Sequence, residues 1–134
     1  MPENEFYSEM ILEYYKSPVN KGAVLHPDFE ARDTNPLCGD DITIQVKLKD
    51  GKVKDIKYQG KGCAISQASA SILTELAQGK TTDELRKFNK DDMMKALGIE
   101  LGPVRIKCAL LGLKVLKLGL YTYLGKDTKE LERL

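Results

Sequence analysis

The sequence predicts an α+β fold with an N-terminal helix, a small antiparallel three-stranded sheet, and several helices packed on one face of the sheet. Two patterns favour this class. Residues 42–58 alternate apolar and polar side chains around a central Asp50-Gly51 pair, and the sequence beyond residue 63 carries repeated helix start signals. The 134 residues suit one domain, so we expect residues 1–134 to form a single domain.

The N-terminal segment predicts one helix followed by a long connection. From Glu5 to Lys16 the apolar residues fit one stripe of an amphipathic helix, and Ser17-Pro18 ends it. Between Asn20 and Pro36, residues typical of loops interrupt scattered apolar residues, which predicts an irregular connection. Long loops in small domains are often functional.

The central segment predicts a β-hairpin. Ile42 to Leu48 has the period of two that is expected of a half-buried strand. Asp50-Gly51 tolerates the positive φ angles of a tight turn, and Val53 to Tyr58 continues as the return strand. We expect a short third strand that reaches Gly62.

The second half of the chain predicts helices. Ala64 to Ala77 is rich in alanine and serine and ends near Gly79, and Thr81 or Thr82 caps a helix that reaches Phe88. Small side chains on the first of these helices allow close packing.

The last third predicts two more helices and a charged tail. Asp91-Asp92 opens a helix through Leu97, and Pro103 suits the first turn of a long final helix. We expect the charged tail from Lys126 to Leu134 to fray. The apolar face of the final helix contains Cys108, Leu110, Leu111, Val115, Leu116 and Leu118.

Composition argues against nucleic-acid and membrane proteins. The 21 Lys and Arg residues against 20 Asp and Glu give a net charge of +1, which leaves little positive excess to neutralise phosphates. No run approaches the roughly 20 apolar residues of a membrane span, and the N-terminus has no signal-peptide pattern. We therefore expect a cytoplasmic protein without a nucleic-acid or membrane partner.

The three cysteines are the main candidates for chemistry. An odd number of widely spaced cysteines does not make a disulfide framework, and a reducing cytosol keeps thiols free. Cys38 and Asp40 lie two apart in an expected extended segment, so a sulfur and an oxygen ligand project to the same side beside the flexible Gly39. The alternative is a turn cysteine beside a solvated aspartate.

The other two cysteines also have two interpretations each. Cys63 stands where a strand gives way to a helix, and a helix N-terminus lowers a thiol pKa; alternatively it is a small buried residue at a tight junction. Cys108 is flanked by the cations of Arg105 and Lys107, which favour the thiolate, but it also lies on the apolar helix face, where core packing explains it.

Taken together, Cys38, Asp40, Cys63 and Cys108 form a complete four-ligand set for tetrahedral Zn²⁺ or for an iron–sulfur cluster. A single oxygen ligand makes such a site more labile than four thiolates, which indicates delivery rather than permanent structure.

His26, Ser69 and Ser71 carry less chemical weight. His26 lies in a proline-flanked loop, where ordinary loop packing explains it better than a ligand role. The serines have no histidine base near them in the sequence, which favours a packed small-residue helix face over hydroxyl chemistry.

These motifs, in this order, resemble the U-type iron–sulfur cluster assembly scaffolds, a family that includes the Isc-type and Suf-type scaffolds and the N-terminal domain of the nitrogen-fixation scaffold. The resemblance covers nearly the whole chain. It rests on Tyr14-Tyr15-Lys16-Ser17-Pro18 with Asn20 and Gly22, Asn35-Pro36-Leu37-Cys38-Gly39-Asp40, Gly60-Lys61-Gly62-Cys63-Ala64-Ile65-Ser66 with Ala68-Ser69-Ala70-Ser71, and Pro103-Val104-Arg105-Ile106-Lys107-Cys108.

The resemblance implies a scaffold, not an enzyme. A labile [2Fe–2S] cluster would be assembled from iron and from persulfide sulfur supplied by a cysteine desulfurase, and passed to acceptor apoproteins. Cys38, Cys63 and Cys108 would be ligands, and Asp40 would ligate or keep the cluster labile. We expect a monomer or a cluster-linked homodimer.

The resemblance gives two answers for sulfur entry. The Isc-type resemblance favours Cys108 as the persulfide acceptor, and we prefer this assignment; the Suf-type resemblance favours Cys38. Charge attraction from Lys107 would then stabilise the Cys108 thiolate or persulfide. The apolar residues Phe6, Tyr7, Met10 and Ile11 fit either the core or a desulfurase-docking face.

Two alternatives compete with the scaffold. Lys107 stands where Isc-type scaffolds have histidine, and Lys is typical of the Suf-type zinc-dependent sulfurtransferases that activate a desulfurase, although their insertion between the second and third cysteines is absent here. The remaining alternative is a structural zinc protein without a transfer role.

Overall fold

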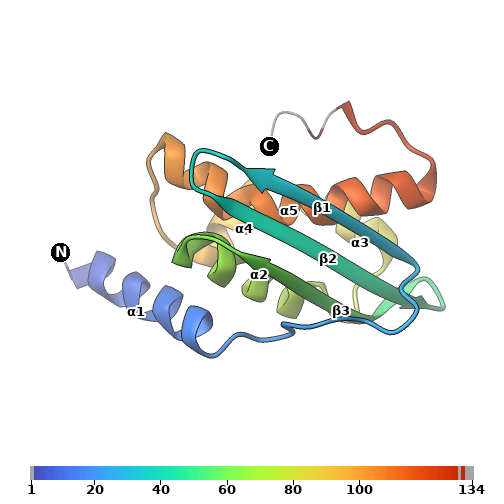
Figure 1. Cartoon of the computed structure of the whole chain (residues 1–134), viewed down its shortest axis with the longest axis horizontal. Coiled ribbons are helices and arrows are strands. Elements are labelled where there is room, and N and C mark those ends of the chain that lie inside the picture. Colours follow the sequence, from blue (N-terminus) through green and yellow to red (C-terminus); the bar gives the residue numbers. More distant parts are fainter. Residues whose placement is uncertain (1, 130, 132–134) are drawn as a thin grey trace.

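A three-stranded antiparallel sheet forms one layer of the molecule, and helices form the other (Figure 1). The computed structural model describes residues 2–129 and 131, with side chains from Glu9 onward. The elements are α1 (Pro2–Lys16), β1 (Phe29–Asn35), β2 (Asp40–Lys49), β3 (Lys52–Lys61), α2 (Ala64–Ala77), α3 (Thr82–Lys87), α4 (Lys90–Leu97) and α5 (Pro103–Leu124).

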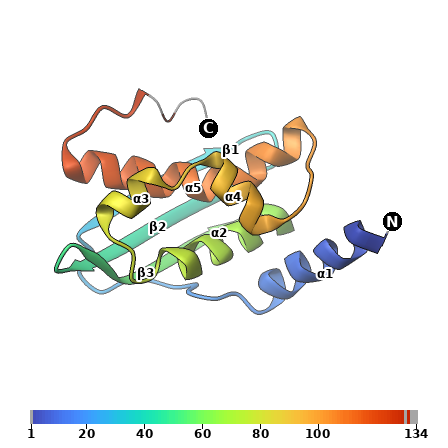
Figure 2. The same ribbon diagram turned by 180° about the vertical axis from the view of Figure 1, so that it is seen from behind.

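The sheet has the order β1-β2-β3, and α2 and α5 pack on one of its faces, with α3 and α4 on the same side (Figures 1 and 2). The residues of β2 and β3 that face these helices are almost fully buried. They are Ile42, Ile44, Val46, Val53, Ile56 and Tyr58. The alternate residues of β2, such as Thr43 and Gln45, are only half-buried. The predicted α+β class and the helices on one face are confirmed.

The predicted irregular connection is wrong over Phe29–Asn35, which forms β1 and pairs antiparallel with β2. This edge strand has only Phe29 and Ala31 as apolar residues on its inner side, while Glu30 and Arg32 are exposed, so its hydrophobic period is too short to recognise. The third strand expected near Gly62 is instead the end of β3, which runs without interruption to Lys61.

The predicted hairpin between β2 and β3 is confirmed. Asp50 and Gly51 both have positive φ angles, 54° and 75°, as a two-residue turn of the type I′ class requires. The antiparallel register shifts between Lys47 and Leu48, where a β-bulge accommodates an extra residue of β3.

The predicted helices are present, with one different cap. Thr81 caps α3 as expected, but α4 is capped by Asn89, whose side chain accepts from the Asp92 amide. The small residues of α2 allow α5 to approach closely, because a Cβ atom added at Gly112 would lie only 3.3 Å from the Ala70 Cα. Ser69 and Ser71 are buried in this helix, as the packing interpretation predicted.

Residues near both ends of the chain are more buried than the sequence suggested. Leu131 is buried, so the predicted fraying is wrong for that part of the tail. In α1, which packs on α2, Ile11 is buried and Met10 is half-buried, so both contribute to the core. The side chains of Phe6 and Tyr7 lie outside those that the structure describes. Over the described residues, no helix is long and apolar enough to cross a bilayer.

Candidate metal centre

Three segments far apart in the sequence meet at one end of the sheet (Figure 1). They are the turn between β1 and β2, the junction between β3 and α2, and the first turns of α5. Cys38 lies in the turn, Cys63 directly precedes α2, and Cys108 lies in the second turn of α5. The fold therefore gathers the three cysteines at the same end.

Three of the four predicted ligands form a compact group. One ligand atom each from Cys38, Asp40 and Cys108 lies within 4.8 Å of the other two, and the sulfurs of Cys38 and Cys108 are 2.9 Å apart. Two soft sulfurs and one carboxylate oxygen are a donor set that suits zinc or iron.

A tight turn, not an extended segment, brings Cys38 to Asp40. Asn35 pairs with Asp40 across the hairpin, and residues 36–39 form the loop between them. The Cys38 amide donates to the Asn35 carbonyl at 3.2 Å, and Gly39 has a φ of 68°, a left-handed conformation that glycine adopts without strain. The predicted juxtaposition is present, but the predicted extended geometry is wrong.

Asp40 is buried, with 1% of its surface exposed. Its Oδ1 accepts from the Cys63 amide at 2.9 Å and from the Ser66 hydroxyl at 3.0 Å, while its Oδ2 has no hydrogen-bond partner among the described residues. Gly62 leaves room for this carboxylate, because an added Cβ atom would overlap the Asp40 side chain. A buried carboxylate oxygen without a donor is suited to a cation.

Cys63 is the N-cap of α2, as predicted for a cysteine at a helix start. Its sulfur accepts from the Ser66 amide at 3.4 Å, and its thiol is half-buried. Cys63 lies outside the 4.8 Å group found among the described residues, but it is close enough to Cys108 to raise the pKa of that thiol.

Cys108 is fully buried. Asn35 Nδ2 donates to its sulfur at 3.7 Å, and the sulfur lies 3.7 Å from the Val104 carbonyl oxygen. Burial raises the pKa of the Cys108 thiol, and contacts with Cys38, Asp40 and Cys63 raise it further.

The two cations that flank Cys108 in the sequence do not share its burial. Arg105 and Lys107 are both exposed on α5, whereas the Cys108 sulfur is in the interior among acidic neighbours. His26 is exposed in its loop, and its carbonyl oxygen accepts from Lys47, so the loop interpretation fits it.

Two polar residues of the site were quoted in the motifs without a role. Asn35 contacts the Cys108 sulfur, and Ser66 contacts both Asp40 and Cys63. The signal for Ser66 was its position three residues after a helix-capping cysteine, where its amide is free to donate. For Asn35, only the packing of α5 against β1 reveals the contact.

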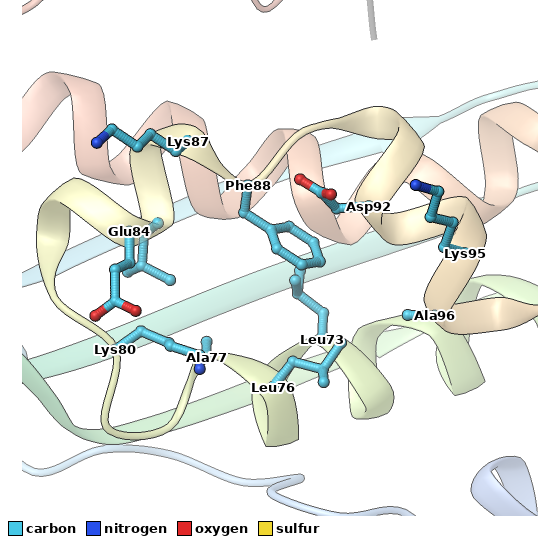
Figure 3. A pocket seen from close by; sticks show the side chains of 11 residues that line it. Leu73, Leu76, Ala77, Lys80, Glu84, Lys87, Phe88, Asp92, Lys95 and Ala96 are labelled. Atoms are coloured by element: carbon cyan, nitrogen blue, oxygen red, sulfur yellow. The ribbon is translucent and has the colours of Figure 1, made fainter.

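A groove of about 670 Å³ lies elsewhere, among α2, α3 and α4 (Figure 3). Leu73, Leu76 and Phe88 line its apolar part, with Lys87 and Lys95 at its edge (Figure 3). It contacts the C-terminal half of α2, whereas Cys63 precedes the first residue of that helix. The groove is thus separate from the cysteine group.

Comparisons with known proteins agree with the motifs. The family model described as "NifU-like N terminal domain" matches residues 6–130. The chain is 36% identical over 123 residues to the iron-sulfur cluster assembly scaffold protein IscU 1 of Archaeoglobus fulgidus, covering 92% of this chain and 80% of that protein. It is 38% identical over 130 residues to the zinc-dependent sulfurtransferase SufU of Bacillus subtilis, covering 84% of this chain and 88% of that protein.

The two alignments differ in their gaps. For the Archaeoglobus protein, 92% of 134 residues is about 123, the full number of aligned positions. For the Bacillus protein, 84% of 134 is about 113, fewer than the 130 aligned positions, so that protein has residues without a counterpart here.

Solved structures share the fold. A putative iron-sulfur cluster assembly scaffold protein for the SUF system from Fervidobacterium islandicum AW-1 has a TM-score of 0.74 and 30% identity, with 85% of this chain and 96% of that chain covered. A NifU-like N-terminal protein from Brucella abortus has the same TM-score at 27% identity, covering 90% of this chain and 96% of that chain. With its motifs, its fold and a family match over residues 6–130 in agreement, this chain belongs to the NifU-like N-terminal domain family.

Proposed function

We propose that this chain is a scaffold, and not an enzyme, on which an iron–sulfur cluster of the [2Fe–2S] type is assembled as cargo. Cys38, Asp40, Cys63 and Cys108 hold the cluster. A cysteine desulfurase supplies the sulfur, and acceptor apoproteins receive the cluster. The whole chain acts as one domain, as a monomer or as a cluster-linked homodimer, and its free thiols suit a reducing compartment such as the cytoplasm.

The observation that carries the proposal is the compact group of Cys38, Asp40 and Cys108 around an unpartnered carboxylate oxygen. Leaving a buried carboxylate oxygen without a donor costs several kcal/mol, and a bound cation offsets that cost. Sulfur and oxygen donors together suit iron–sulfur clusters and zinc better than hard cations such as magnesium.

The relatives support the scaffold over the sulfurtransferase. Two relatives with scaffold names, from Archaeoglobus fulgidus and Escherichia coli, cover 90% or more of this chain. The Archaeoglobus alignment needs no gap in this chain, and the Escherichia coli scaffold alignment leaves about 8 positions without a residue of this chain (129 against about 121), against about 17 for the sulfurtransferase (130 against about 113). This agrees with the absence of the Suf-type insertion.

The route of sulfur entry follows from exposure. We preferred Cys108 as the acceptor, but its thiol is fully buried, whereas Cys38 is partly exposed beside the exposed Leu37. An incoming persulfide therefore reaches Cys38 before Cys108. The role for Lys107 in stabilising the Cys108 thiolate stays a prediction, to be checked by the rate of sulfur acceptance in Lys107→Ala.

The second candidate is a zinc-dependent sulfurtransferase. The observation that favours it is the 38% identity to SufU, together with Lys107 before the third cysteine. The same four side chains complete a tetrahedral zinc site, so zinc content after purification does not separate the two functions. A structural zinc protein is the third candidate and has only the donor set in its favour.

Anaerobic reconstitution tests the proposal. The metal-free chain is incubated with Fe²⁺, cysteine and a cysteine desulfurase, its visible spectrum is recorded, and an apo-ferredoxin is added. The scaffold shows a [2Fe–2S] spectrum that moves to the ferredoxin. Stable zinc with no cluster, and a faster desulfurase, identifies the sulfurtransferase instead.

Single substitutions test the ligand set. Cys38→Ala, Cys63→Ala and Cys108→Ala should each abolish the cluster spectrum, because a four-ligand site that loses a thiolate is left open. Normal loading of Cys63→Ala would remove Cys63 from the set. Far-UV circular dichroism of each variant checks that the fold is retained.

A further inference from the structure

The sulfurs of Cys38 and Cys108 are close together but unequally exposed. They are 2.9 Å apart, and Cys38 is partly exposed while Cys108 is fully buried. The partly exposed Cys38 thiol can accept a sulfur atom from an external donor. It lies against the Cys108 thiol, which is too buried to do so. In this arrangement one cysteine can accept a sulfur atom as a persulfide, and the second can attack the Sγ of the first and release that sulfur atom.

We propose that Cys38 and Cys108 form a dithiol that reduces a persulfide to sulfide within this chain. The inference rests on the proposed function, since it describes how the sulfur delivered to the site reaches the oxidation state of a cluster. It adds an internal reduction step to the sulfur acceptance already described.

The step balances within the chain. Persulfide on Cys38 carries one sulfane sulfur beyond Sγ, and the Cys108 sulfur attacks Cys38 Sγ. The Sγ–Sγ bond forms, the bond between Cys38 Sγ and the sulfane sulfur breaks, and that sulfur leaves as hydrosulfide while the Cys108 thiol proton passes to it or to water. Two electrons from the cysteine pair reduce the sulfane sulfur, and the pair becomes a disulfide.

The geometry selects attack on the inner sulfur. Cys108 Sγ already lies beside Cys38 Sγ, and in a disulfide the two sulfurs are roughly 2.05 Å apart, so a movement of about 1 Å closes the bond. The side chain of Asn35 and the carbonyl of Val104 contact the Cys108 sulfur on its other sides. Cys63 lies outside the compact group, which makes it the poorer partner among the described thiols.

The disulfide has a consequence for the cargo site. It removes two of the proposed ligands, so a thiol reductant must cleave it before a cluster binds. Without such a reductant each chain should release about one sulfide, and with a small dithiol present it should release sulfide repeatedly.

The test uses the full, metal-free, reduced chain and two persulfide donors. One donor is a cysteine desulfurase charged with cysteine and then freed of small thiols; the other is glutathione persulfide. Released sulfide is measured, free thiols are alkylated, and intact mass and peptide mapping identify persulfides and disulfides. The result expected is about one sulfide per chain and a disulfide between the peptides of Cys38 and Cys108.

Cys108→Ser separates the step from simple sulfur acceptance. We expect the persulfide to remain on Cys38, as a chain heavier by one sulfur, and sulfide release to fall by at least about tenfold. The sulfide that Cys108→Ser still releases with glutathione persulfide measures how much persulfide glutathione itself reduces. The control Thr122→Ala, at an exposed position in the last turn of α5, should match the wild type.

The outcomes separate this inference from the proposed function. A stable persulfide on the wild-type chain, with no sulfide and no disulfide, overturns the inference and leaves the scaffold intact. If glutathione persulfide yields sulfide and the disulfide but the desulfurase transfers no sulfur, the inference is supported. The proposed function then loses the desulfurase as its sulfur source. If Cys108→Ser does not fold, disulfide mapping of the wild type still decides.

Discussion

The two ends of the sheet satisfy their polar groups in different ways. At the end with the β2–β3 turn, the chain provides its own partners: the Val53 amide donates to Lys80 at 2.8 Å, Gly79 to Val53 at 3.0 Å, and Thr82 to Gly51 at 3.2 Å. At the cysteine end, Asp40 Oδ2 is buried without a partner and two thiols contact each other.

From this difference we infer that the end with the β2–β3 turn maintains the fold and that the cysteine end binds a ligand. Unpaired buried polar groups cost stability, so a protein retains them where something else supplies the partner. Two of the three unpartnered buried side-chain atoms among the described residues, Asp40 Oδ2 and Gln67 Oε1, belong to or adjoin the cysteine end. The end with the β2–β3 turn, called the closed end below, thus supplies stability that offsets the cost of the unpaired polar groups at the cysteine end.

The largest effect on metal binding should come from removing the unpartnered oxygen. In Asp40→Asn the amide oxygen still accepts from the Cys63 amide and the Ser66 hydroxyl, but an NH₂ group replaces Oδ2. We expect the dissociation constant for zinc to rise by about 10- to 100-fold, because a nitrogen with two hydrogens does not ligate a metal. Competition with a chromogenic zinc chelator measures it.

The next residue along the strand is the matched control. Asp41 points to the opposite side and forms an ion pair with Arg32, which holds the pKa of the Asp41 carboxyl below its usual range. Asp41→Asn should leave zinc affinity unchanged within about twofold. An equal loss in both variants would mean that general negative charge, and not ligation by Asp40, attracts the metal.

Glycine substitutions compare the two ends directly. A Cβ atom at Gly62 would overlap Asp40 at a φ of 143°, whereas one at Gly51, with a φ of 75°, would meet open space. We expect Gly62→Ala to lower the free energy of unfolding by about 3 kcal/mol and Gly51→Ala by about 1 kcal/mol. Urea denaturation measures both.

Zinc should separate these two variants further. Gly62→Ala displaces the Asp40 carboxylate, so it should also lose the stabilisation that zinc gives, while Gly51→Ala should keep it. Equal losses of stability, with zinc stabilisation kept in both, would show that the cysteine end tolerates a side chain against Asp40.

The sequence predicted what depends on local chemistry. The Asp50-Gly51 turn and the Thr81 cap of α3 follow from residue types that have one strong local preference. It missed β1, because an edge strand with two inward apolar residues has little periodicity of its own. Pairing with β2, a long-range contact, defines that strand.

The candidate site divides in the same way. The four candidate ligand residues could be read from motifs, but the environment of Cys108 could not. The sequence places Arg105 and Lys107 beside it, whereas the helix turns both cations outward and the thiol inward. The contacts of Asn35 and Ser66 also depend on tertiary structure.

A smaller effect is expected at the closed end from Thr81→Ala. The Thr81 hydroxyl accepts from the Glu84 amide at 3.0 Å and caps α3. Its loss should lower the free energy of unfolding by about 1 kcal/mol, as for other helix caps. Zinc affinity should not change, since the cap is at the other end of the sheet. A change in zinc affinity would show that the two ends are coupled.

The smallest effect should be the pH dependence of the same cap. The Glu84 carboxylate accepts from the Thr81 amide at 3.1 Å, and this bond, followed by the Thr81 hydroxyl and then Lys80 and Lys52, lowers the pKa of Glu84 below its usual 4.5. A lowered pKa in the folded state stabilises the protein above the usual pKa, and that stability is lost as the pH falls through the folded value.

Glu84→Gln keeps the reciprocal cap but removes the charge. Wild type should therefore exceed Glu84→Gln in urea midpoint at neutral pH and lose this advantage in acid. If the advantage of the wild type persists in acid, the cap stabilises the protein through hydrogen-bond geometry alone. The negative charge of Glu84 then contributes nothing to the stability of this end of the sheet.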